Sequence, residues 1–386
     1  MVSPVAYTYL DHAATTPMRP EAVAAMLPFL SERFANPSGS HRFAREARRA
    51  IDEARDVVAG VIGCKPGEVI FTSGGTEADN TAILGSVARH GGTAVCSATE
   101  HHAVLESVQQ VGGHVVATSS TGAIDLDALA STLDELTDVT VVSVMTVNNE
   151  VGTINDVAAA RAVVRRHAPN ALFHTDAVQA ACWLDLRAIT PHADFLSLSA
   201  HKFGGPKGVG VLVAREGAQF APSLVGGGQE AERRSGTHNV GGIVAMAEAL
   251  RLTDADRATD ISRIGPLRDR LVAELVARLP GVYETVARDR KVAGSAHICI
   301  EGIENEALLF MLDEACLCAS AAAACAAGAM EPSHVLSAMG VPRELALGAL
   351  RLTLGVTTTE ADIDRAVEVV VDAVQRLRRA RVKVSS

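Results

Sequence analysis

Short apolar runs alternate with amphipathic helical stretches between residues 68 and 214. The first six runs are each followed by a turn or helix signal, and they are continuously apolar, which is typical of strands buried on both faces of a mostly parallel sheet. The pattern predicts a doubly wound α/β domain with ligand groups at the carboxyl ends of the strands. The runs are EVIFTS (68–73), TAVCSA (93–98), HVVATS (114–119), VTVVSVM (139–145), ALFHTD (171–176), DFLSLS (194–199) and GVGVLVA (208–214).

The pattern changes after about residue 250. A polar helical stretch leads into a strand, AHICIEG (296–302), a helix, NEALLFMLDEA (305–315), and a final helix from about Glu360. This order predicts a smaller α+β domain onto which the first dozen residues pack. We therefore assign residues 15–255 to a large domain, and residues 1–14 with 256–386 to a small one.

The composition of the chain supports this division and excludes several classes of protein. The length of 386 residues predicts two to three domains, and the low aromatic content of 3% favours helices packed on a buried sheet. The formal net charge of −10 argues against direct nucleic-acid binding, which needs clustered cations. The chain shows neither a signal peptide nor a continuous apolar span, so we predict a cytoplasmic protein that does not bind membranes.

Seven cysteines are scattered along the chain, too few and too irregular for a disulfide framework. Cys316 and Cys318 form a CLC sequence that lacks the spacing of a zinc pair, so we predict no metal site. We expect these two cysteines to lie in the core rather than to relay sulfur.

Two strand ends carry groups suited to a pyridine-based cofactor. In SLSAHKFGGPKGVG (197–210), Lys202 follows a strand and precedes glycines, where its amine can reach a bound molecule. In HTDAVQA (174–180), Asp176 ends a strand and Gln179 follows it. A buried carboxylate there keeps a pyridinium nitrogen protonated. Taken alone, Lys202 also fits a solvated loop and Asp176 a helix N-cap.

Three further strand ends supply polar groups. In TSGGTEADN (72–80), the amides of Gly75 and Thr76 open a helix and can receive a phosphate, although an ordinary capped helix start fits equally well. In EHHAVL (100–105), either His101 or His102 can lie over a planar ring. TVNNEVGT (146–153) places two asparagines where they can bond to a cofactor oxygen or a carboxylate.

Together these motifs resemble the cysteine desulfurases of the IscS/NifS type, which are fold-type I pyridoxal-phosphate enzymes of the class V aminotransferase family. The resemblance runs in the same order along nearly the whole chain. The motifs are YLDHAATTP (9–17), ANPSGSH (35–41), TSGGTEADN, EHHAVL, NNEVGT (148–153), HTDAVQ (174–179), SAHKFGGPKGVG (199–210), GGGQE (226–230) with RRSGTHN (233–239), EPSHVLSAMG (331–340) and LRLTLG (350–355).

The resemblance implies roles for individual residues around pyridoxal 5'-phosphate. Lys202 is expected to bind the cofactor covalently and to move protons. Asp176 is expected to pair with the pyridine nitrogen, Gln179 with the ring hydroxyl oxygen, and His101 to stack on the ring.

The remaining contacts implied are with the phosphate and the substrate. The phosphate is expected to lie among Gly75, Thr76, Ser199 and His201. Thr237 is expected to reach the phosphate of the partner subunit, so the enzyme would be a homodimer. Asn149 is expected to contact the cofactor and, with Arg351, the α-carboxylate of L-cysteine, which Arg351 would bind as a bidentate fork.

The resemblance also implies that Cys325 is the nucleophile, six positions before Glu331. It would take the sulfur of L-cysteine as a persulfide, release L-alanine and pass the sulfur to an acceptor protein, with a nearby base such as His101 forming the thiolate. The run before Cys325 is unusual, because Ala322 and other alanines replace the family's glycine and serine residues. Since alanine favours helix over glycine, we expect an ordered loop, about 318–332, that restricts the acceptor.

Two alternatives stay open at this point. A related lyase acting on selenocysteine or on cysteine sulfinate would not need Cys325, and a scaffold without turnover would only dock sulfur-transfer partners. The destination of the sulfur also stays open among iron–sulfur assembly, tRNA thiolation, DNA sulfur modification and thio-containing metabolites, as does the need for an accessory activator.

Overall fold

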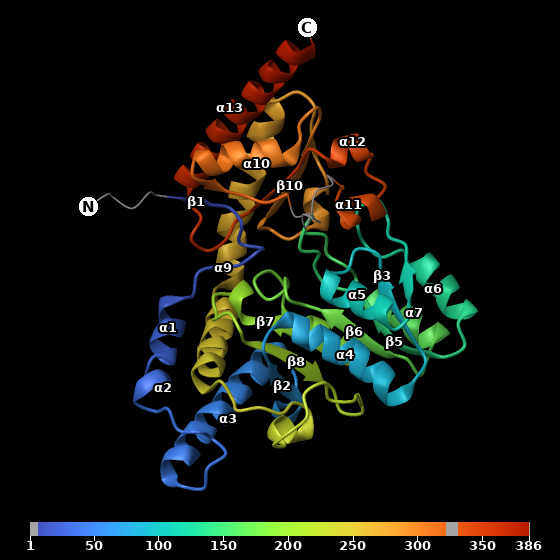
Figure 1. The fold of residues 1–386 in the computed structure, drawn as a ribbon, viewed down its shortest axis with the longest axis vertical. Helices are drawn as coiled ribbons and strands as arrows, with labels where there is room; N and C mark the ends of the chain where they lie inside the picture. The colour runs from blue at the N-terminus through green and yellow to red at the C-terminus, as the bar shows by residue number, and fades with distance from the viewer. Residues whose placement is uncertain (1–6, 322–330, 386) are drawn as a thin grey trace.

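A seven-stranded sheet forms the centre of the larger part of the molecule (Figure 1). The structure, a computed structural model, describes residues 7–321 and 331–385. The strand order is β2-β8-β7-β6-β5-β3-β4, and only β8 runs antiparallel to its neighbours. All seven predicted runs form strands and the α/β class is confirmed: β2 (Val69–Thr72), β3 (Thr93–Ser97), β4 (His114–Val116), β5 (Val139–Ser143), β6 (Leu172–Asp176), β7 (Phe195–Ser199) and β8 (Gly210–Ala214).

Helices cover both faces of this sheet, which explains the continuously apolar strands. On β2, Val69 and Phe71 pack into one core, whereas Ile70 packs into another on the opposite face. Helices α4 (Gly75–His90) and α5 (His102–Gln110) cover the face of Ile70. The other face carries α3 (Arg42–Ile62), α6 (Leu126–Glu135), α7 (Val157–His167) and the first part of α9 (Val240–Arg278).

A second core surrounds a smaller sheet of order β12-β10-β9, near the C-terminal end of the chain (Figure 1). Its strands are β9 (Val282–Glu284), β10 (Ser295–Ile300) and β12 (Ala349–Thr353), and its main helices are α10 (Asn305–Glu314) and α13 (Glu360–Ser385). A parallel pair, β1 (Thr8–Tyr9) with β11 (Leu317–Cys318), brings Leu10 into this core.

Helix α9 runs through both parts of the molecule (Figure 1). Its residue Leu250 belongs to the core of the large sheet, and Ile264 to the core of the small sheet. The predicted boundary at 255/256 falls between these two residues, inside the helix, and the assignment of domains remains a prediction.

Short elements complete the described chain. They are α1 (Pro20–Met26), α2 (Pro28–Ser31), α8 (Leu186–Ile189), α11 (His334–Ala338), α12 (Arg343–Ala346) and five 3-10 helices. None of the helices in residues 7–321 and 331–385 combines the length and the apolar character needed to cross a membrane. The expectation that Cys316 and Cys318 lie in the core is wrong, because Leu317 points inward at β11 and leaves both cysteines half-buried.

Candidate active site

A cavity of about 650 Å³ opens at the carboxyl ends of the parallel strands, where the doubly wound fold predicts a ligand site. Ten of the predicted site residues line it: Gly75, Thr76, His101, Asn149, Asp176, Gln179, Ser199, His201, Lys202 and Arg351. Thr237 is exposed and does not line this cavity. Cys325 and most of its alanine-rich loop lie outside the described residues.

Lys202 enters the cavity from the 3-10 helix Ala200–Lys202, directly after β7. Its Nζ donates to the carbonyl oxygens of Ala13 (2.6 Å) and Ala14 (2.8 Å). Burial, reinforced by the positive charge of Arg351, lowers the pKa of Lys202 to about 8. Lys202 is therefore much more often uncharged near neutral pH than an exposed lysine, as an amine that attacks a carbonyl must be.

Asp176 is the last residue of β6, and its side chain is almost fully buried at 4% exposed. Its Oδ1 accepts a hydrogen bond from the Val178 amide (2.8 Å), so the carboxylate caps a turn rather than a helix. Desolvation and the neighbouring Asp79 raise the pKa of Asp176 to about 6. A cation placed against this carboxylate would relieve both effects, which suits the protonated nitrogen of a pyridine ring.

His101 rather than His102 faces the cavity. Its Nδ1 accepts the Ala103 amide (3.1 Å) as the N-cap of α5, so the neutral ring carries its proton on Nε2. Burial removes water from around the ring and lowers the pKa of His101, which favours the neutral base. His102 instead lies near Glu106 and the ring of His334.

The start of α4 forms a cradle for an anion. Gly74 at the N-cap makes no side-chain hydrogen bond, so the amides of the first turn are available at the positive end of a 16-residue helix. A Cβ atom at Gly75 would lie 2.7 Å from Cγ2 of Val178, so only glycine fits there without a shift of its neighbour. With Thr76, Ser199 and His201 beside it, this cradle fits a phosphate.

Arg351 on β12 closes the cavity from the smaller sheet. Its Nη2 bonds to Oδ1 of Asp11 (2.6 Å), and its Nη1 donates to the carbonyl oxygen of Asn149 (3.0 Å). Its Nε is buried and has no hydrogen-bond partner among the described residues. An unpartnered buried donor beside Asn149 fits a substrate carboxylate.

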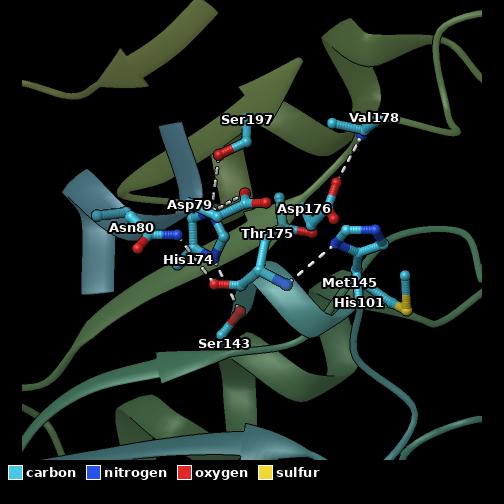
Figure 2. Close-up of polar contacts among 12 residues, drawn as sticks. Asp79, Asn80, His101, Ser143, Met145, His174, Thr175, Asp176, Val178 and Ser197 are labelled. Carbon is cyan, nitrogen blue, oxygen red and sulfur yellow. Dashed lines mark hydrogen bonds and ion pairs between the residues drawn. The ribbon is translucent and has the colours of Figure 1, made fainter. Parts of the chain in front are cut away.

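Sequence reasoning missed three residues of this site. Asp11 bonds to Arg351 from 340 positions away, which no local pattern could predict. Asp79 and His174 are both buried near Asp176 (Figure 2). Asp79 lies in the motif TSGGTEADN and His174 in HTDAVQA. Neither residue ends a strand, as Asp176 does, so no local signal marked them as part of the site.

The comparisons with known proteins agree with this geometry. Residues 8–366 match the Aminotransferase class-V family. The cysteine desulfurase IscS of Dictyoglomus turgidum is 40% identical over 378 residues, covering 96% of this chain and 95% of that protein. The IscS-like cysteine desulfurase of Mycobacterium tuberculosis is 43% identical over 385 residues, covering 96% and 97%. A solved NifS-like protein has a TM-score of 0.89 at 31% identity, with 96% of this chain and all of that chain covered.

The chain therefore belongs to the class V aminotransferase family and, within it, to the cysteine desulfurases of the IscS/NifS type. Enzymes of this family depend on pyridoxal phosphate. The residues present fit that cofactor, because one cavity combines an amine with a lowered pKa, a buried carboxylate and an uncapped helix start.

Proposed function

We propose that this chain converts L-cysteine to L-alanine with pyridoxal phosphate and transfers the sulfur, as a persulfide on Cys325, to an acceptor protein. One observation carries the proposal: Lys202, Asp176 and Arg351 line the same cavity. These three groups meet the three needs of the reaction, namely covalent attachment of the cofactor, a protonated pyridine nitrogen and recognition of an α-carboxylate.

Pyridoxal phosphate, when bound, supplies an electron sink for the bonds at the substrate α-carbon. The protein would supply everything else. Arg351 and Asn149 orient the carboxylate, Asp176 holds the proton on the ring nitrogen, and Gln179 bonds to the ring oxygen. The Lys202 amine, with its pKa near 8, accepts and returns a proton at the α-carbon.

His101 is the proposed base for thiol chemistry. Its neutral form is favoured by burial and by the cap on α5, and it lines the cavity that the substrate enters. In that form it can take the proton from the attacking thiol, which must be a thiolate to attack the substrate sulfur. The attacking thiol is assigned to Cys325 from its register with Glu331 in the family motif.

The proposed enzyme is a homodimer that acts in the cytoplasm. Thr237 is exposed on its own subunit and would reach the phosphate in the partner's site. The acceptor of the sulfur is a protein whose pathway stays open.

Formation of L-alanine from L-cysteine by the pyridoxal-phosphate-loaded enzyme tests the proposal. We expect Lys202→Ala to abolish turnover and the visible absorbance of the bound cofactor. We expect Cys325→Ser to abolish persulfide and multiple turnover while leaving that absorbance intact. If Cys325→Ser forms alanine as fast as the wild type, the enzyme is instead a lyase that does not use this thiol, and selenocysteine and cysteine sulfinate would then be compared as substrates.

A further inference from the structure

A cluster of four buried polar residues lies beside Asp176, and no role above uses it (Figure 2). Asp79 comes from α4, Ser143 from β5, His174 from β6 and Ser197 from β7. All four are at most 1% exposed. We call these four residues the inner cluster. Because apolar side chains of similar size would avoid the cost of burying a carboxylate, such a cluster calls for a functional reason.

Hydrogen bonds give the inner cluster a direction. Nδ1 of His174 lies 2.8 Å from the Ser143 hydroxyl, and Nε2 lies 3.0 Å from the Ser197 hydroxyl. Burial lowers the pKa of His174 to about 4, so its ring is neutral and donates through one nitrogen only. Desolvation raises the pKa of Asp79 to about 7, and the Ser197 hydroxyl opposes this shift by hydrogen bonding to the ionised form. Donors thus run from Ser143 to His174, then to Ser197, and end on Asp79.

Strand geometry places this chain of donors beside Asp176. His174 and Asp176 are two residues apart on β6, so their side chains lie on the same face of the sheet. Asp79 lines the same cavity as Asp176, and Oδ1 of Asp79 lies 3.4 Å from Nε2 of His174. That Oδ1 has no hydrogen bond in the described part of the chain, so above about pH 7, where Asp79 is ionised, its charge is poorly neutralised and acts on its neighbours.

We propose that Asp79 is a positioning residue that acts through Asp176: its carboxylate, oriented by Ser197 and His174, makes the potential at Asp176 more negative and tightens the hold of Asp176 on a proton of the cofactor's ring nitrogen. The proposal rests on the proposed function, which places that nitrogen against Asp176. It adds the Asp79 carboxylate as a second negative charge that acts on the contact between Asp176 and the ring nitrogen.

Other titratable groups around Asp176 do not fill this role. His101, on the loop before α5, opposes the effect, because it lowers the pKa of Asp176. Glu100 is fully buried, desolvation raises its pKa well above the ordinary range and favours its neutral form, and its Oε1 accepts the Met145 amide (2.6 Å). Asp79, in contrast, is among the causes that raise the pKa of Asp176, second only to desolvation.

The first arm of the test uses the holoenzyme loaded with pyridoxal phosphate labelled with ¹⁵N in the ring. Its ¹⁵N chemical shift reports the protonation of the ring nitrogen against pH. We expect Asp79→Asn, which keeps the shape but removes the charge, to lower the midpoint of ring-nitrogen titration by about one pH unit. Ser197→Ala should lower it by less, because the charge stays but loses the hydrogen bond that favours it.

The second arm uses the full chain after removal of the cofactor, labelled with ¹³C in the aspartate carboxyl groups. The Asp176 signal is assigned by its loss in Asp176→Asn, and its midpoint should fall in Asp79→Asn. Ser143→Ala is the matched control, since it removes a hydroxyl from the same cluster but leaves Asp79 and Ser197 in place; neither midpoint should move.

An unchanged midpoint in either arm for a folded Asp79→Asn protein overturns the proposal. If Asp79→Asn does not fold, Ser197→Ala decides in the same way. Failure of the proposed function gives a different result, because Asp176→Asn would then leave the ring nitrogen protonated. If the ring nitrogen loses its proton in Asp176→Asn while its titration midpoint is unchanged in Asp79→Asn, only the role of Asp79 is rejected.

Discussion

At the scale of single residues, the cavity is defined by groups that alter one another's charge. Lys202 and Arg351 line the same cavity, and the fixed charge of Arg351 helps to keep the Lys202 amine neutral. Arg351 is itself held by Asp11, on a segment that also accepts hydrogen bonds from Lys202 at Ala13 and Ala14. The same N-terminal segment therefore positions both the Lys202 amine and the Arg351 guanidinium.

The lowered pKa of Lys202 predicts how the empty enzyme takes up its cofactor. Only the neutral amine attacks the aldehyde of pyridoxal phosphate, so the uptake rate should rise about tenfold per pH unit and level off above a pH of about 8, not near the ordinary value of 10.5. Stopped-flow absorbance of the full chain against pH measures this rate.

Two substitutions of Arg351 provide the control. Arg351→Gln removes the positive neighbour and should move the levelling-off point to higher pH, whereas Arg351→Lys keeps the charge and should not. A rate that still rises steeply at pH 10 in the wild type would contradict the lowered pKa.

At the scale of elements, the start of α4 depends on the absence of a side chain. Gly75→Ala would press a methyl group against Val178, two residues after Asp176. We expect the dissociation constant of pyridoxal phosphate to rise at least about tenfold, since the first-turn amides lose their alignment with the phosphate. Fluorescence titration of the cofactor-free chain measures this constant.

Gly60→Ala is the matched control for that substitution. Gly60 lies inside α3, and a Cβ atom there meets nothing within 4 Å. Cofactor affinity should stay unchanged, and the free energy of unfolding should rise by about 0.5–1 kcal/mol because alanine favours helix. Equal loss of affinity in both variants would show that the helix start is not the phosphate site.

A buried contact ties α11 to the segment that follows β5. Ser333, the N-cap of α11, donates to the carboxylate of Glu150, and both side chains are buried. Glu150 follows Asn149, and Ser333 lies just after the undescribed residues 322–330. The contact therefore holds one end of the alanine-rich loop against the proposed substrate site.

Glu150 should make the protein less stable as the pH rises. Desolvation raises its pKa from 4.5 to about 7, so the folded state binds a proton that the unfolded state has released. Its stabilising contribution is complete below about pH 4.5 and is lost as the pH rises to about 7. Relative to Glu150→Gln, the wild type should lose roughly 1–3 kcal/mol of unfolding free energy over this window, measured by urea unfolding.

The exposed Glu331 supplies the comparison for Glu150. Glu331→Gln removes a carboxylate near the same helix start and should leave the pH dependence of stability as in the wild type. If Glu150→Gln follows the wild-type curve as well, the carboxylate is not the group that titrates with folding.

The sequence predicted the elements and much of the site because both depend on local signals. Continuous apolar runs predicted the strands. Polar residues after those runs predicted the sheet edge where Lys202 and Asp176 line one cavity. Asp79 could not be found in this way, because an acidic residue inside a helix ordinarily faces solvent and only tertiary packing buries it. The bond from Asp11 to Arg351 depends likewise on the closing of the whole chain.

At the scale of the whole molecule, one cavity draws on three distant parts of the chain. The large sheet supplies Lys202 and Asp176, the small sheet supplies Arg351, and the N-terminal segment lies between them through Asp11 and Ala13. Helix α9 joins the two cores as one continuous element. The proposed homodimer adds a fourth part, the loop that carries Thr237.

The loop before Thr237 is held in a strained shape by polar contacts to the buried Glu230 carboxylate. Glu230, Ala231 and Glu232 have positive φ angles of 52°, 55° and 66°. Residues other than glycine rarely adopt this backbone conformation. Arg55 grips the Glu230 carboxylate through both Nη atoms (2.8 and 2.7 Å), and Nε2 of His238 lies 2.7 Å from Oε1 of Glu230. These contacts fix the backbone of the loop, while the side chain of Thr237 stays exposed. An exposed residue on a rigid loop is suited to contact a partner subunit.

A mixing experiment tests whether each active site uses Lys202 from one subunit and Thr237 from the other. Thr237→Glu would place a negative charge against the phosphate and should abolish activity, as should Lys202→Ala. In a dimer of one chain of each kind, one site carries both defects and the other carries neither. Denaturing and refolding an equal mixture should therefore restore about a quarter of wild-type activity, since half of the dimers are mixed and each has one intact site. Thr237→Ser, which keeps the hydroxyl, should stay active alone, and a mixture that remains inactive would show that the sites are not shared.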